Sequence, residues 1–195
     1  MLREAERLKK IEQLTELVNL YEAKRQAGRL RPAEAKKYKE ALEELTKWTR
    51  IQKGFESIFY FAHTYFSSDP PHDLIRPDVP SAKFHEELCQ LLRETAMSVE
   101  SRRTAIAAPR SHAKSVYCTN IFPVWLVCYK DDIPTDPYWI IVGDDVDSAR
   151  KQLDIVKMSL ESNPKIVEDF GNLKGSVWNA YEIVTSNGVK IEAAG

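Results

Sequence analysis

The sequence predicts an α/β protein with a mostly parallel sheet flanked by helices, preceded by an N-terminal α-helical extension. In the first 53 residues, apolar side chains recur at helical spacing, with a single glycine and a single proline among them. From residue 103 onward, apolar runs of strand length alternate with amphipathic stretches, which is typical of a parallel sheet with helices on its faces. A proline-rich segment, residues 67–81, separates the two regions.

Length and composition agree with this architecture. The 195 residues correspond to roughly one domain of about 150 residues with an appendage. Hydrophobic residues are 43% and charged residues 29%, which excludes global disorder and collagen-like repeats. The net charge of -1 does not indicate a nucleic-acid partner. The charge is uneven, however, because residues 1–53 carry 14 Lys and Arg against 9 Asp and Glu.

The N-terminal region predicts two helices joined by a tight turn. One helical stripe carries the apolar residues Leu8, Ile11, Leu14, Val18 and Tyr21. The turn lies at Gly28–Pro32, because glycine often ends a helix and proline often opens one. The second helix is expected to run to about Trp48. This αα-hairpin suits a packing or oligomerisation arm, and a basic arm that binds nucleic acid is the alternative.

An aromatic helix, Phe55–Phe66, is predicted next. Its buried face should hold Phe55, Phe59, Ala62 and Phe66. The five prolines of residues 67–81 exclude a helix or a central strand there. Ser81 is the expected N-cap of a helix over residues 82–100.

The remaining elements follow in alternation. We expect strands at 103–107 and 138–142, helices at 115–129 and 147–162, and a hairpin of 181–185 with 189–193. Pro123 should kink the first of these helices.

The cysteines and the apolar runs limit the class of protein. Cys89, Cys118 and Cys128 are odd in number and lack metal-binding spacing, so they predict buried thiols in a reducing compartment. The longest apolar run, residues 121–129, falls short of the roughly 20 residues that a membrane-spanning helix needs. The N-terminal sequence has no apolar segment of signal-peptide length.

Residues 108–115, Ala-Pro-Arg-Ser-His-Ala-Lys-Ser, carry the clearest chemical signal. They follow the spacing of the phosphate-binding pattern G-x-x-x-x-G-K-[ST], with Ala108 and Ala113 in place of both glycines. Alanine can still supply backbone N–H groups to a phosphate if its φ is not strongly positive. Lys114 would then reach the β- and γ-phosphates of ATP, and the Ser115 hydroxyl would ligate Mg²⁺. The alternative is an ordinary strand–loop–helix turn with a solvated Lys114.

The sequence of this loop resembles the corresponding loop of the large terminase subunits, the DNA-packaging motors of tailed bacteriophages. In that family the loop often has the sequence P-R-G-H-x-K-S. Supporting similarities are the Phe84–Leu88 segment (F-H-x-E-[IL]), the aromatic helix, the strand at 138–142 and the final strand at 189–195. The resemblance covers about residues 55–195 and leaves the first 50 unexplained.

This resemblance implies an ATPase of the additional-strand P-loop class that uses Mg²⁺ and ATP to translocate double-stranded DNA into a procapsid. The family context implies a portal and a small terminase subunit as partners, a homo-oligomeric ring, no membrane, and the host cytoplasm. It divides the chain into a helical extension (1–66), a linker (67–81) and an ATPase core (82–195) that ends before the Walker B acids. The family's nuclease domain is expected to be absent. The alternatives are another P-loop motor, helicase-like or recombinase-like, and a non-enzymatic interaction module.

The resemblance also implies roles for single residues. Arg110 would act in cis as an arginine finger on the γ-phosphate, or else form a salt bridge or face DNA. Pro109, Ser111 and His112 belong to the loop, and Ser111 and His112 would offer backbone N–H groups. His85 stands where many relatives carry a glutamine that recognises adenine, and an ordinary surface histidine is the alternative.

Two acids after the strand at 138–142 need separate treatment. Asp144 and Asp145 imitate a Walker B strand end, which would supply a carboxylate ligand to Mg²⁺, but the resemblance makes this the second strand. We therefore expect both acids, with Asp147, to cap the following helix. Because the true acids would lie beyond Gly195, the chain should hydrolyse ATP poorly on its own.

Overall fold

The computed structural model describes residues 2–67, 71–76, 78–135 and 138–195. They form two compact units, Leu2–Glu56 and Ser57–Gly195.

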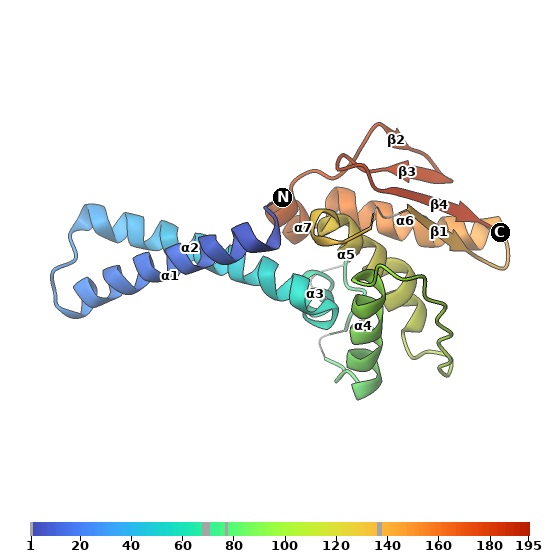
Figure 1. The fold of residues 1–195 in the computed structure, drawn as a ribbon, viewed down its shortest axis with the longest axis horizontal. Coiled ribbons are helices and arrows are strands. Elements are labelled where there is room, and N and C mark those ends of the chain that lie inside the picture. The colour runs from blue at the N-terminus through green and yellow to red at the C-terminus, as the bar shows by residue number, and fades with distance from the viewer. Residues whose placement is uncertain (1, 68–70, 77, 136–137) are drawn as a thin grey trace. The chain divides into compact units, whose positions relative to one another are not determined.

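The first unit is a helical hairpin of α1 (Glu4–Gln26) and α2 (Pro32–Glu56), as the sequence predicts (Figure 1). Its small core contains Leu14, Val18 and Ala41, with Tyr38, Leu45 and Trp48 packed against them. Gly28 has a φ of 66° in the connecting turn, a conformation that favours glycine. The second helix continues to Glu56, past the expected end near Trp48.

The second unit begins with the aromatic helix α3 (Ile58–Tyr65), followed by α4 (Lys83–Ala96). The buried face of α3 is formed by Ile58, Phe61, Ala62 and Tyr65. The predicted face was therefore wrong at Phe59, which is half-buried. The buried face differs because a separate helix begins after Ser57. The Ser57 side chain caps α3 by accepting a hydrogen bond from the Tyr60 amide at 3.1 Å.

The helix α4 begins one residue later than predicted. Its N-cap is Ala82, and Ser81, the predicted cap, instead places its Oγ 3.0 Å from Nε2 of His63. The described part of 67–81 contains no helix or strand, and residues 68–70 and 77 lie outside the described residues.

A continuous helical stretch, 114–128, follows the candidate loop and matches the predicted helix at 115–129. It consists of a π-helical turn, η1 (Val116–Ile121), and α5 (Phe122–Cys128), which is buried along its whole length. Pro123 lies at the junction, and the missing proline N–H explains why the regular hydrogen-bond ladder is broken there. A short 3₁₀ turn, η2 (Lys130–Asp132), ends this region.

The sheet has four short strands in the order β1-β4-β3-β2: β1 (Tyr138–Val142), β2 (Val177–Trp178), β3 (Glu182–Val184) and β4 (Lys190–Ala194). The pair β1–β4 is parallel, and the pairs β4–β3 and β3–β2 are antiparallel. The helix α6 (Val146–Ser162) packs along β1 and β4, and α7 (Pro164–Phe170) follows it (Figure 1). The predicted strand at 138–142, helix at 147–162 and terminal hairpin are confirmed, whereas α7 and β2 were not predicted.

The predicted fold class was wrong. The sheet is small and mixed, so the chain does not have the mostly parallel sheet of a P-loop NTPase of the additional-strand class. Residues 103–107, expected to be a buried strand, have no regular secondary structure, and all but Ile106 are exposed. Ile106 is the only large apolar residue of this segment, so pairing it with the sheet would bury little apolar surface.

Candidate functional site

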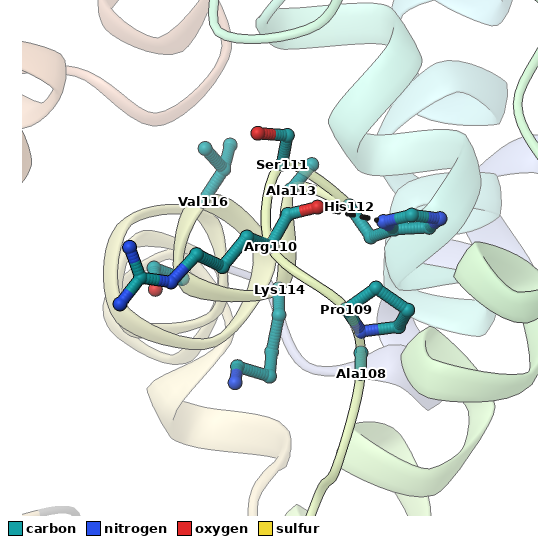
Figure 2. A pocket seen from close by; sticks show the side chains of 9 residues that line it. Ala108, Pro109, Arg110, Ser111, His112, Ala113, Lys114 and Val116 are labelled. Carbon is teal, nitrogen blue, oxygen red and sulfur yellow. Dashed lines mark hydrogen bonds between the residues drawn. The ribbon is translucent and has the colours of Figure 1, made fainter.

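The predicted loop lines one hollow. Its walls are the continuous run Ala108–Val116, and its volume is about 340 Å³. The hollow lies at the start of the helical stretch 114–128 (Figure 2). All eight residues predicted for the loop are therefore neighbours around a single cavity, with Val116 added. The first N–H groups of a helix have no acceptor within it, so they are available to a ligand there.

The backbone of this loop is strained at two positions. Ser111 has a φ of 65° and Ala113 a φ of 51°, and both lie in the left-handed region. This conformation costs a residue with a Cβ roughly 1–2 kcal/mol. Alanine can serve at these positions only where its φ is not strongly positive, and Ala113 does not meet that condition. Ala113 occupies the second glycine position of the phosphate-binding pattern. It adopts the left-handed conformation at a cost in backbone strain that glycine would not have.

Two positive charges belong to the loop. Lys114 is half-buried and Arg110 is exposed. Within the described residues, neither side chain forms an ion pair or a side-chain hydrogen bond. Figure 2 shows both side chains extending to the opposite side of the loop from the His112 ring. Both residues line the hollow, and no described acid pairs with either charged group.

His85 holds the loop from the start of α4. Its Nδ1 accepts a hydrogen bond from the Ala82 amide at 3.1 Å, so its Nε2 carries the proton and donates to the His112 carbonyl at 3.2 Å. The ring also stacks on Tyr117 at 5.2 Å. His112 in turn donates from Nδ1 to the Arg110 carbonyl at 2.9 Å. These contacts give His85 a structural role in the loop, and its role toward adenine stays a prediction.

The acids after β1 divide into different environments. Asp145 caps α6, because its Oδ1 accepts from the Ser148 amide at 2.7 Å, and this bond lowers the pKa of its carboxyl. Asp147 pairs with Arg150 at 3.0 Å in the first turn of α6. Capping is confirmed for Asp145 only. Asp144 lines a second hollow of about 260 Å³ at the end of β1.

This second hollow contains residues that the sequence argument missed, above all Thr119 and Gln152. Nδ2 of Asn120 donates to Oε1 of Gln152 at 3.0 Å, which joins η1 to α6, and the Thr119 hydroxyl donates to the Ser115 carbonyl at 2.6 Å. Its spacing of four residues from Ser115 would have placed both on one helical face, but only the fold brings Gln152 to them.

The three cysteines are free thiols. Cys89 and Cys128 are buried and Cys118 is half-buried, so the prediction of buried thiols fits two of them. Burial raises the pKa of Cys89 to about 12. No group of three or more His, Cys, Asp or Glu side chains suited to a metal ion occurs in the described part of the chain. No helix among the described residues is long and apolar enough to cross a membrane.

The chain matches no known protein-family model, no curated protein and no solved structure. The similarity to large terminase subunits therefore rests on the sequence motifs alone.

Proposed function

We propose that residues 108–116 bind the polyphosphate chain of ATP. The observation that supports this most is the single hollow lined by that run, with Arg110 and Lys114 as unpaired cations among the described residues. A polyphosphate suits such a site because its oxygens accept hydrogen bonds from backbone N–H groups and from both cations.

The residues fit Mg²⁺ as well as phosphate in their donor chemistry. The exposed Ser115 hydroxyl lines the hollow and is a hard oxygen donor, the kind of ligand that Mg²⁺ takes together with waters and substrate phosphates. When bound, the ion would neutralise charge on the phosphate oxygens. In this proposal Lys114 holds the β- and γ-phosphates and Arg110 supplies positive charge to the γ-phosphate as hydrolysis proceeds.

The wider proposal is that this ATPase drives double-stranded DNA into a viral procapsid, together with a portal and a small terminase subunit. It depends on the similarity of the loop and its flanking segments to large terminase subunits. Binding of ATP is its first requirement and is the step to test first.

Titration with a non-hydrolysable ATP analogue tests the site. Lys114→Ala should weaken binding by about 10-fold or more, because it removes a charge-assisted contact to phosphate. Lys36→Ala, which removes an exposed lysine of α2, is the matched control and should bind like the wild type. Unchanged affinity in the Lys114 variant would refute the proposed site.

A non-enzymatic interaction module is the second candidate. It is favoured by the apolar residues that β1 leaves exposed, Tyr138, Ile140 and Val142, at 54%, 50% and 72%. This candidate predicts that the wild-type chain binds no ATP analogue, so the same titration separates the two.

A further inference from the structure

We infer that the tip of the helical hairpin, residues 24–39, is a binding surface for the phosphate backbone of double-stranded DNA. The tip comprises the last residues of α1, the connecting turn and about two turns of α2, which the hairpin brings together at one end (Figure 1). It lies outside the segments that resemble large terminase subunits and outside the candidate loop. The inference therefore does not depend on the binding of ATP.

The positive charge of the N-terminal region is concentrated in this tip. Residues 24–39 contain seven of the 14 Lys and Arg of residues 1–53, but only one of the 9 Asp and Glu. The other residues of that region carry seven bases against eight acids, so they are nearly neutral together. The net charge of -1 for the whole chain conceals the tip, because it sums regions of opposite sign.

The acid of the tip, Glu34, has partners within the hairpin. Its Oε1 accepts a hydrogen bond from Nζ of Lys24 at 2.8 Å, and its Oε2 accepts from the Arg31 amide at 3.0 Å. These bonds tie the start of α2 to the end of α1, and they lower the pKa of the Glu34 carboxyl, so it stays ionised. Glu34 therefore neutralises Lys24 and leaves the other six cations of the tip.

These six cations are available to an anion. Four of them are exposed and form no ion pair or side-chain hydrogen bond with a described residue: Arg25, Arg29, Arg31 and Lys37. The other two, Lys36 and Lys39, lie 3.8 and 3.7 Å from an acid one helical turn further on, and their side chains stay 82% and 78% exposed. Exposed pairs of this kind contribute little to stability, so both lysines can exchange their partner for a phosphate.

The tip lacks the apolar side chains that an acidic protein or a lipid surface would need. All of its residues are described, and none of them is an exposed large apolar side chain; the nearest along the chain are Leu20 and Leu42. A protein interface is centred on apolar or aromatic anchors, and a membrane-surface helix inserts an apolar face among the lipid headgroups. Contacts to phosphate need only exposed cations, so a nucleic acid fits the tip best.

A DNA duplex suits the tip better than a single strand or an RNA duplex. Proteins that hold single strands stack the bases on aromatic rings. The aromatic residue of the tip, Tyr38, is half-buried, and its ring packs edge-on against Tyr21 with the centroids 6.2 Å apart. Duplex DNA presents one phosphate charge per roughly 1.7 Å of its axis. Its major groove, about 12 Å wide, also admits an α-helix, whereas the narrow major groove of an RNA duplex does not.

Fluorescence anisotropy of a dye-labelled DNA duplex of mixed sequence, titrated with the full chain at several salt concentrations, tests this surface. Each phosphate contact contributes about -0.9 to the slope of log K against log[salt], so the four unpaired cations should give a slope of about -3.6. Arg29→Gln combined with Lys37→Gln should bring the slope to about -1.8 and weaken binding about 10-fold or more at about 0.1 M salt. Because both side chains are exposed and unpaired among the described residues, the melting temperature should not change.

Lys9→Gln combined with Arg102→Gln is the matched control. It removes one lysine and one arginine at exposed positions outside the tip, and it should bind the duplex like the wild type. The inference is wrong if the wild type does not bind the duplex, or if the two double variants bind it with equal affinity and slope. It is also wrong if a single strand, an RNA duplex, poly-glutamate or phosphatidylserine vesicles bind the chain as tightly as the DNA duplex.

The nucleotide site is tested separately. Both double variants should bind the ATP analogue like the wild type, because neither changes the candidate loop. If Lys114→Ala binds the analogue normally, the proposed function fails and the inference about the tip stands. If duplex binding does not depend on the tip while Lys114→Ala loses the analogue, the inference fails and the proposed function stands.

Discussion

The protein should become more stable toward unfolding when Ala113 is replaced by glycine. Its φ of 51° costs a side chain with a Cβ roughly 1–2 kcal/mol, and glycine removes that cost. The substitution also frees the unfolded chain, which costs about 0.4–1 kcal/mol. The balance is a stabilisation of about 0.5–1 kcal/mol, or an increase in melting temperature of roughly 1–4 °C for a chain of this size.

Ala108→Gly provides the control within the same loop. Ala108 occupies the first glycine position of the pattern and has no positive φ, so this variant bears the entropic cost alone. Subtracting one variant from the other cancels the unfolded-state contribution and leaves the roughly 1–2 kcal/mol of backbone strain. Urea unfolding followed by tryptophan fluorescence measures both variants. Equal destabilisation by the two glycines would refute the argument that Ala113 is strained.

Two further predictions concern stability. Tyr65→Phe should destabilise the protein by roughly 1–3 kcal/mol in urea unfolding, because the buried Tyr65 hydroxyl donates to Asp169 at 2.6 Å and the carboxylate would lose that donor; an unchanged urea midpoint would contradict this. Burial, and less strongly His85, lower the pKa of His63, so the unfolded chain binds more protons and stability should fall as pH drops through about 6.5. Since His63→Gln removes this group, its urea midpoint should fall less between about pH 7.5 and about pH 5.5 than that of the wild type, and equal falls would count against the assignment.

Local sequence patterns predicted most of the elements. The apolar stripe through Leu14 and Val18 predicted α1, and the apolar run 138–142 predicted β1. These predictions succeeded because helix periodicity and strand composition depend on residues close together in the chain. They failed at 103–107. A strand exists only through its partners, and one isoleucine among small and polar residues did not secure a place in the sheet.

The candidate site shows the same division. The order of Lys114 and Ser115 along the chain could be read directly, and the structure puts them around one hollow. The positive φ of Ala113 could not be predicted from the sequence, because alanine ordinarily avoids positive φ. The distinct environments of Asp144 and Asp145 were also hidden, since adjacent acids differ only in what the fold places beside them.

By itself, the sequence determined the helical hairpin, the individual elements that follow it and the run of residues that forms the loop. Only the tertiary structure decided which strands pair, which acid caps α6, and that Ser115 lies between two hollows. The reason is physical: helix periodicity, caps and turns depend on residues close in the chain, whereas sheet pairing and cavities depend on contacts between distant ones.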